Sequence, residues 1–280
     1  MEALHYLNGK WVDTADLKIS AFDLSVVRGF GVFDFLRTYD NKPFLLDDHL
    51  DRLFSSAKLI GIKMPKSKSE LAKIVFTGVK KNKFKETNIK IIVTGGKSAD
   101  SITPGNPSLI LMFLNYHDYP HKFYTRGIKV ITVREGRSLH LAKSLNYLAA
   151  VISVQKAKQK GAEEALYING KGKLYEATRS NFFAVIDGKL ITVKQQVLHG
   201  VTRKVVIRLA NKLQIPVIER DVFTGEIANF SEAFVTATNK EVMPVVQIDN
   251  KKIGKGRIGP ITKKLMAEYS KLTRSDDPFF

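Results

Sequence analysis

The 280-residue sequence contains no cysteine, a single tryptophan and no long hydrophobic run. The absence of cysteine excludes a disulfide framework and any metal site built from thiolates, and we expect no metal site of another kind. No segment reaches the roughly 18 consecutive apolar residues that a membrane-spanning helix requires, so no membrane partner is expected. The first residues, MEALHYLNGKWVD, lack the basic start and long apolar core of a secretory signal. We therefore expect a cytoplasmic protein.

Acidic residues are also scarce, because 27 Asp and Glu stand against 45 Lys and Arg, a formal net charge of +18. Such an excess occurs in proteins that bind nucleic acids. Here the basic residues are spread along the whole chain, and the sequence contains no helix-turn-helix or zinc-finger pattern. We therefore do not expect nucleic acid as a partner. The charge is interpreted as a solvated basic surface or as a field that attracts anionic small molecules.

Residues 1–115 predict a smaller N-terminal domain of strands and helices. Asn8-Gly9 lies between apolar residues and is typical of a hairpin turn, while Ser67 and Glu70 form a capping-box pattern at a helix start. Apolar periodicity predicts the other elements. The expected elements are hairpins around Asn8-Gly9 and within 31–44, helices within 45–62 and 67–82, and strands at 88–96 and 108–114.

The remaining chain predicts a second, larger domain. Residues 116–127 are polar, contain Pro120 and are interpreted as an interdomain linker. Residues 128–280 mix strand hairpins with helices expected at about 144–160, 201–213 and 258–272, which argues against a simple parallel doubly wound sheet. The predicted fold is therefore a two-domain protein of the α+β or mixed α/β class.

A lysine at the start of one of these predicted helices raises a chemical question. Lys143 lies in HLAKSLNYLAAV and is followed by Leu145, Tyr147 and Leu148. An apolar setting of this kind penalises the charged ammonium and lowers its pKa. Lys143 either extends its ammonium to water or supplies a neutral amine as a nucleophile.

Four other segments carry residues suited to the same chemistry. In GKLYEATRSNFFAV, Glu176 ends one predicted strand and Ser180-Asn181 open another. In LHGVTRKVVIRLA, a helix begins near Val201 and Thr202, where unpaired backbone N–H groups favour a phosphate. The short polar side chains of Thr236, Thr238 and Asn239 follow in FVTATNKEVMPV, and Arg52 lies on the helix predicted within 45–62, where a guanidinium can bind phosphate bidentately.

Each of these residues alone has an ordinary explanation. Thr202 could be a helix N-cap, Arg52 a surface charge and Glu176 a solvated acid at a strand end. Their order along the chain is more specific. From NGKWV (8–12) to IGPITKKL (258–265), the sequence resembles the class IV aminotransferases, which are pyridoxal-phosphate enzymes of fold type IV. This family includes branched-chain and D-amino-acid transaminases and aminodeoxychorismate lyase.

The resemblance implies a role for each residue. Lys143 would form the Schiff base with pyridoxal 5'-phosphate and then move protons as a base. Glu176 would lie beside the pyridine nitrogen and keep it protonated, and Tyr147 would lie near the phenolic oxygen. The family fold implies a cofactor site between the two domains and a homodimer. The expected cofactor-binding residues are Arg52, Lys143, Tyr147, Glu176, Ser180, Asn181, Val201, Thr202, Thr238 and Asn239.

The substrate carboxylate needs a partner, and neither trap known from the family is present. D-amino-acid transaminases use Arg and His after a VTRG-like strand, but VTGGKSADSI has neither. Branched-chain enzymes use Tyr-x-Arg, but this chain has Asn88 and Lys90 there. Since an unpaired charge in a closed site is costly, we expect Arg28 and Lys90 to bind the carboxylate and Phe33 to line the pocket. A solvent-facing Lys90 and an Arg28 paired with the partner subunit remain alternatives.

The Thr202-Arg203 pair favours a transaminase over a lyase. The segment KSLN, residues 143–146, is similar to that of D-amino-acid transaminases. The favoured prediction is amino transfer from D-amino acids, such as D-glutamate or D-alanine, to 2-oxoglutarate or pyruvate. A branched-chain L-amino-acid transaminase is the alternative. A remote alternative is a non-catalytic nucleic-acid-binding protein on an enzyme scaffold.

Overall fold

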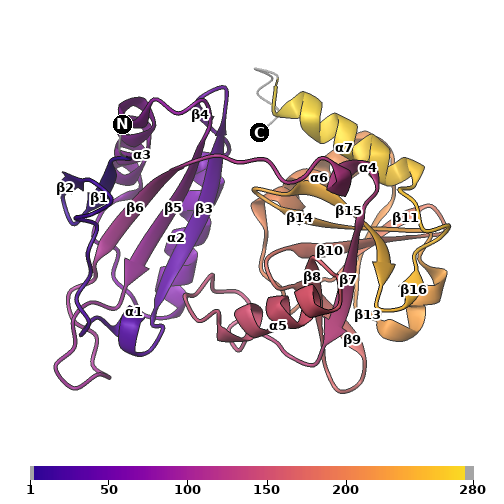
Figure 1. Cartoon of the computed structure of the whole chain (residues 1–280), viewed down its shortest axis with the longest axis horizontal. Helices are drawn as coiled ribbons and strands as arrows, with labels where there is room; N and C mark the ends of the chain where they lie inside the picture. The colour runs from indigo at the N-terminus through magenta and orange to yellow at the C-terminus, as the bar shows by residue number, and fades with distance from the viewer. Residues whose placement is uncertain (1–2, 275–280) are drawn as a thin grey trace. The chain divides into compact units, whose positions relative to one another are not determined.

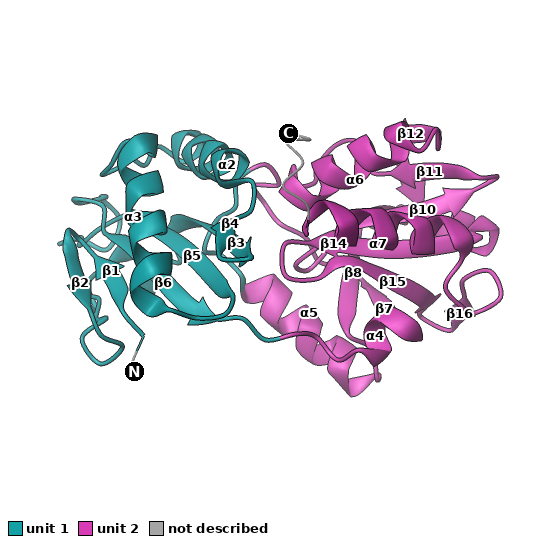
Figure 2. Ribbon diagram, turned by 90° about the horizontal axis from the view of Figure 1, so that it is seen from above, with its two compact units in different colours: residues 1–117, 142–147, 280 teal, residues 118–141, 148–279 magenta. Residues whose placement is uncertain are grey.

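Apolar side chains form separate cores in two units of the computed structural model, which describes residues 3–274 (Figure 2). Unit 1 contains the described residues up to His117 together with Ala142–Tyr147. Unit 2 contains Asp118–Leu141 and the described residues from Leu148 onward. The segment expected as a linker, 116–127, includes the change from one unit to the other and a short helix, α4 (Lys122–Thr125).

Unit 1 is an antiparallel sheet with helices on one face (Figure 1). The strand order is β2-β1-β6-β5-β3-β4. The side chains of alternate strand residues pack against α2 and α3 in one hydrophobic core, which leaves the other face of β3 and β5 for other contacts. The elements are β1 (His5–Leu7), β2 (Lys10–Val12), α1 (Leu24–Val27), β3 (Gly31–Tyr39), β4 (Lys42–Pro43), α2 (Leu46–Leu59), α3 (Lys68–Asn82), β5 (Thr87–Thr94) and β6 (Leu109–Asn115).

The local signals in this unit are confirmed. Asn8 and Gly9 both have positive φ, as a two-residue hairpin turn between β1 and β2 requires. Asp40 and Asn41 do the same between β3 and β4. At α3, the Ser67 side chain accepts from the Glu70 backbone N–H, and the Glu70 carboxylate accepts from the Ser67 N–H at 2.8 Å.

Unit 2 contains a mixed sheet rather than a parallel one (Figure 1). The order is β12-β11-β10-β14-β15-β7-β8-β9-β13, with β16 paired to β15. Strand β7 is parallel to β8 and β15, whereas β8–β9, β10–β14 and β14–β15 are antiparallel. The strands are β7 (Ile128–Val133), β8 (Glu164–Ile168), β9 (Lys173–Ala177), β10 (Asn181–Ile186), β11 (Lys189–Thr192), β12 (Val217–Glu219), β13 (Val222–Phe223), β14 (Glu232–Ala237), β15 (Glu241–Ile248) and β16 (Lys251–Lys252).

The helices of unit 2 pack on this sheet. α5 (Leu148–Gln159) contacts β7 and β8, while α6 (Val201–Lys212) and α7 (Pro260–Leu272) contact each other and β14. A 3-10 helix, η1 (Thr224–Asn229), adds Ile227 to the core. The predicted mixed α+β class is therefore confirmed. Among the helices between residues 3 and 274, none is long and apolar enough to cross a membrane.

The helix expected at about 144–160 is present as α5, but it begins at Leu148, so only its predicted start was wrong. Residues 143–145 are extended and pair with the start of β3. The Phe33 N–H donates to the Lys143 carbonyl and the Leu145 N–H donates to the Gly31 carbonyl, both at 2.9 Å. These bonds connect positions at least 110 residues apart, which a local helical pattern does not reveal.

A buried ion pair joins β3 to α2. The Asp34 carboxylate is fully buried and accepts from Arg52 Nε and Nη2, both at 2.8 Å, while His49 Nδ1 lies 2.7 Å away. Burial alone would raise the pKa of Asp34, but the charge and hydrogen bonds of Arg52, together with His49, hold it well below its usual range. Asp34 is therefore ionised and anchors the guanidinium of Arg52.

Replacing Asp34 by Asn should destabilise the fold by roughly 3–5 kcal/mol at pH 7, because it leaves a largely buried Arg52 without its counter-charge. A carboxyl whose folded pKa is depressed stabilises the protein above its unfolded pKa of about 3.9, and this contribution is lost as pH falls below that value. Urea unfolding followed by circular dichroism should thus show a larger difference between wild type and D34N at pH 7 than at pH 3. Exposed Asp16→Asn is the control and should leave the midpoint unchanged; equal effects of D34N at both pH values would contradict this account.

Candidate functional site

Lys143 is held in unit 1 by contacts to two elements. Its carbonyl accepts from the Phe33 N–H of β3, and its own N–H donates to the buried Ser56 Oγ of α2 at 3.1 Å. The side chain is half-buried, and Nζ lies 4.6 Å from the centroid of the Phe33 ring. The backbone is therefore fixed independently of the amine, which is the arrangement that a reactive lysine needs.

Phe33 also brings Lys90 and Tyr147 to Lys143. Lys90 Nζ is 4.9 Å from the Phe33 centroid, and the Tyr147 ring meets Phe33 edge-on at 5.3 Å. Burial lowers the pKa of Lys90. Lys90 is therefore a partly desolvated cation rather than a fully solvent-facing one, and binding an anion would favour its charged form.

Arg37 lies on the same face of β3 as Phe33, and the sequence analysis did not select it as a candidate site residue. It is 5% exposed, and its Cζ lies 4.1 Å from the Tyr39 ring centroid and 3.5 Å from that of Tyr116. Alternation along the strand places it with Phe33 and Phe35. This period-two pattern is the signal that could have identified it.

The other two arginines predicted for the site occupy different settings. Arg28 is exposed at the end of α1, and its Nη1 donates to the Val27 carbonyl at 2.9 Å. Arg52 is bidentate to Asp34, which uses two of the five guanidinium N–H groups. Nη2 also lies 3.3 Å from His49 Nδ1, so side chains of β3 and α2 together hold the guanidinium in place.

In unit 2, Glu176 is buried rather than solvated at a strand end. Its Oε1 accepts from Arg137 Nη1 at 2.9 Å, and its Oε2 accepts from the Leu198 N–H at 3.0 Å and from Asn181 Nδ2 at 3.4 Å. The Asn181 amide also donates to the Leu198 carbonyl at 2.8 Å. These contacts orient the carboxylate and link β9 to the segment before α6. They suit a residue that must present a charge to a ring nitrogen.

A cavity of about 270 Å³ adjoins Glu176, and its lining includes the cations Arg134 and Arg137 and the acids Glu135 and Glu176. His140 stacks on Tyr175 with ring centroids 5.9 Å apart, and burial, then Arg137 and Lys173, lower its pKa. Arg137 was not selected as a candidate site residue from the sequence. The only sequence signal was its position six residues before Lys143. The lining includes Arg134, Arg137, His140, Tyr175, Glu176 and Gln196.

The start of α6 lies close to the side chain of Asn181. Gly200, not Thr202, is the N-cap, so the ordinary explanation for Thr202 was wrong. A Cβ on Gly200 would lie 2.0 Å from Asn181 Oδ1, so a larger residue there would force the Asn181 side chain to move. Val201 and Thr202 are buried in the first turn, where backbone N–H groups lack helical partners.

The turn between β14 and β15 adds short polar side chains. Thr238 and Asn239 are half-buried in this turn, and Asn239 Nδ2 donates to the Tyr119 hydroxyl at 3.4 Å. Thr236 lies opposite Asn181 in the β10–β14 pairing, so the two side chains share a face. The buried Thr236 Oγ1 has no hydrogen-bond partner among the described residues. An orphaned buried hydroxyl beside a helix start fits a phosphate oxygen.

Ser180 belongs to a different cluster. Its hydroxyl donates to Glu164 Oε2 at 2.9 Å and accepts from Lys240 Nζ at 3.0 Å. The structure therefore brings Glu176 and Asn181 together in unit 2, and Lys143, Phe33 and Lys90 together in unit 1, while Ser180 faces a buried ion pair.

The comparisons with known proteins agree with this chemistry. The family model for amino-transferase class IV matches residues 31–248. The chain is 37% identical over 274 residues to a putative branched-chain-amino-acid aminotransferase of Methanocaldococcus jannaschii, with 94% of each protein covered. It is 32% identical over 277 residues to a D-alanine aminotransferase of Staphylococcus haemolyticus, with 96% of this chain and 98% of that protein covered.

A solved structure gives the same answer for the fold. The crystal structure of branched-chain amino acid aminotransferase from Escherichia coli matches with a TM-score of 0.93 at 26% identity, over 99% of this chain and 97% of that one. The relatives thus include both substrate classes, and the preference for D-amino acids stays a prediction. Since the family match spans most of the sequence, the chain belongs to the class IV aminotransferases, which use pyridoxal 5'-phosphate.

Proposed function

We propose that this aminotransferase moves the amino group of a D-amino acid, such as D-glutamate or D-alanine, to 2-oxoglutarate or pyruvate. The observation that carries the proposal is that Lys143 and Lys90 share the ring of Phe33, with Nζ atoms 4.6 and 4.9 Å from its centroid. A reactive amine and a carboxylate-binding cation would thereby be available at one aromatic ring. The KSLN segment and the D-alanine aminotransferase relatives support the D-amino-acid class.

Under this proposal Lys143 would hold pyridoxal 5'-phosphate covalently, and Glu176 would pair with its ring nitrogen. Its phosphate would be bound by the first N–H groups of α6, at Val201 and Thr202, and by the Thr238 and Asn239 turn. The orphaned Thr236 hydroxyl adds a donor, and Arg52, Tyr147 and Asn181 complete the proposed set. Ser180 would act indirectly, because its hydroxyl is bonded to Glu164 and Lys240. When bound, pyridoxal phosphate supplies the electron sink that stabilises negative charge at the substrate Cα.

The chain's own residues then have defined tasks. Lys143, once the substrate amine has displaced it and left it as a neutral amine, would remove the proton from the substrate Cα and deliver it to the former aldehyde carbon of the cofactor. Glu176, held by Arg137 and the Leu198 N–H, keeps a proton on the ring nitrogen. Lys90 neutralises the substrate carboxylate, because a buried carboxylate without a counter-charge would bind poorly.

A branched-chain L-amino-acid transaminase is the second candidate. Phe33, Phe35 and Met112 share a sheet face with Lys90, and this apolar lining also fits a branched side chain. The Methanocaldococcus jannaschii relative supports this class. The two candidates differ in stereochemistry, which gives a direct test.

Purified holoenzyme should form glutamate from 2-oxoglutarate with D-alanine as donor, and much less with L-leucine or L-alanine. Chiral chromatography of the product should show D-glutamate, because both half-reactions use the same face of the cofactor. The K143A variant is the control and should lose activity with every donor, since it lacks the base and the covalent link. L-glutamate formed from L-leucine would establish the second candidate instead.

The carboxylate role is tested separately. K90M should raise the KM for the amino donor at least about tenfold with a smaller change in kcat, because losing an ionic partner costs roughly 2 kcal/mol or more. Exposed Lys85→Met, five residues earlier, is the matched control. R28L should act in the same direction if Arg28 reaches a carboxylate in the site of a partner subunit. Unchanged KM values in K90M and R28L would remove both residues from the substrate site.

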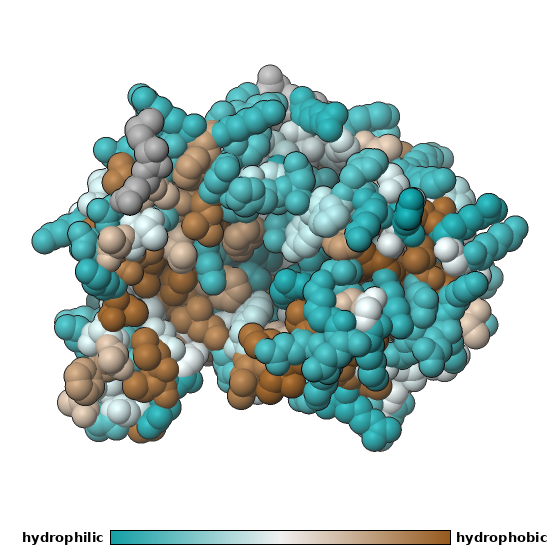
Figure 3. Space-filling model, in the orientation of Figure 1, coloured by the Kyte–Doolittle hydropathy of each residue, from teal (hydrophilic) through white to brown (hydrophobic). Residues whose placement is uncertain are grey.

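We also propose that the enzyme is a homodimer. α5 exposes Leu148, Val151 and Ile152, which at spacings of three and four lie on one helix face (Figure 3, lower centre). Leu148 is 69% exposed and Val151 is 53% exposed, although both are apolar. An exposed apolar face of this kind is typical of an interaction surface.

Light scattering after size exclusion should give twice the chain mass for the wild type. The V151E variant should shift the population toward the monomer, since a charge on the apolar face disfavours its burial. Lys171→Glu, an exposed substitution elsewhere in unit 2, should leave the mass unchanged. A monomeric wild type would exclude this role for α5.

A further inference from the structure

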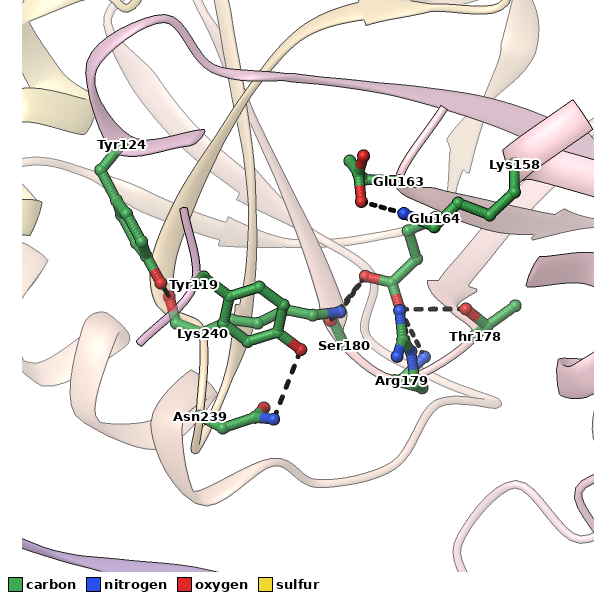
Figure 4. Close-up of polar contacts among 10 residues, drawn as sticks. All are labelled: Tyr119, Tyr124, Lys158, Glu163, Glu164, Thr178, Arg179, Ser180, Asn239 and Lys240. Carbon is green, nitrogen blue, oxygen red and sulfur yellow. Dashed lines mark hydrogen bonds and ion pairs between the residues drawn. The ribbon is translucent and has the colours of Figure 1, made fainter. Parts of the chain in front are cut away.

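One buried carboxylate in unit 2 collects donors from two separate segments (Figure 4). Glu164, the first residue of β8, is fully buried. Its Oε1 accepts from Thr178 Oγ1 at 2.9 Å and from the Arg179 N–H at 2.8 Å. Its Oε2 accepts from Ser180 Oγ at 2.9 Å and from Lys240 Nζ. The segment 178–180 and Lys240 are thus tied to the same side chain.

The pair is ionic and almost completely removed from solvent. Lys240 is 3% exposed, and its Nζ also donates to Ser180 Oγ at 3.0 Å. Burial alone would raise the pKa of Glu164, but Lys240, Arg179 and the hydrogen bonds hold it below its usual range. Glu164 therefore stays ionised. Its counter-charges are the buried Lys240 and the partly exposed Arg179, whose Nε lies 3.5 Å from Glu164 Oε1.

The two segments held by Glu164 continue into the residues assigned to the cofactor. Residues 178–180 connect Glu176 to Asn181. Lys240 directly follows Thr238 and Asn239, and its carbonyl accepts from the Tyr124 hydroxyl at 3.2 Å. Asn239 Nδ2 donates to the Tyr119 hydroxyl at 3.4 Å (Figure 4). The turn is therefore fixed through its lysine side chain, its backbone and its asparagine.

We propose that Glu164 and Lys240 are positioning residues that hold the turn 238–240 in the geometry required for the cofactor phosphate. This inference rests on the proposed function, which assigns Thr238 and Asn239 to the phosphate. A buried ion pair is often no more stabilising than apolar side chains of the same volume. Its distinctive contribution is directional, because the carboxylate dictates where each of its donors lies. The pair is thus suited to geometry more than to stability.

A comparison of pyridoxal phosphate with pyridoxal, which lacks the phosphate, separates an effect on the geometry of the turn from an effect on overall stability. Apoenzyme titrated with either compound, followed by absorbance, should show that K240M weakens pyridoxal phosphate at least about tenfold and pyridoxal by less than about threefold. The phosphate-specific loss is expected because the turn would no longer be held in place. Lys158→Met is the matched control, because Lys158 pairs with Glu163, the residue before Glu164, at a much more exposed position. Its affinities for both compounds should stay at wild-type values.

The double variant E164Q/K240M removes both charges. It tests whether weaker binding in K240M results only from misfolding. We expect its Tm to recover toward the wild-type value, since no unpaired buried charge remains, while its phosphate-specific loss persists. Two results would overturn the proposal by showing that the pair is only structural. The first is that K240M weakens the binding of both compounds equally. The second is that the double variant recovers both its Tm and wild-type affinities. Failure of the proposed function itself would appear differently, as a wild type without Lys143-dependent amino transfer.

Discussion

The backbone pairing between residues 143–145 and the first residues of β3 is the interaction on which the candidate chemistry depends. It sets a lysine from the middle of the chain against Phe33, which lies more than 100 residues earlier. Gly31 makes the approach possible, because a Cβ there would lie 2.6 Å from Leu145 Cδ1 and 2.8 Å from the Val93 carbonyl. A larger residue would force the segments apart and move the amine away from the ring.

Three buried acids each form an ion pair that joins separate segments of this basic chain. Asp34 is matched by Arg52, Glu176 by Arg137 and Glu164 by Lys240. Removing either partner of such a pair leaves an uncompensated charge, so each pair strongly restricts the segments that carry it. Two of the three carry residues that the family resemblance assigned to the cofactor, namely Arg52 and Glu176. The third lies next to Ser180 and to the turn that contains Asn239.

The sequence predicted those features that depend on neighbouring residues. The Asn8-Gly9 turn, the Ser67 and Glu70 capping box and the start of α6 near Val201 all follow from local preferences. The start of α5 was misplaced because residues 143–145 pair with a distant strand. Arg137 and Lys240 were missed for the same reason, since each acquires meaning only from a carboxylate elsewhere in the chain. Arg28 and Lys90 show the limit of motif reasoning: both are cations, yet one is exposed and the other is partly desolvated.

Under the proposed function, the unpaired hydroxyl of Thr236 would link folding to the supply of a small molecule. A buried donor without an acceptor costs roughly 1–3 kcal/mol, and a ligand that accepts this hydrogen bond removes that cost. Any such ligand binds the native state and not the unfolded chain, so its free concentration enters the folding equilibrium through mass action. The lifetime of this enzyme in a cell would then follow the availability of vitamin B6 as well as the enzyme's own packing.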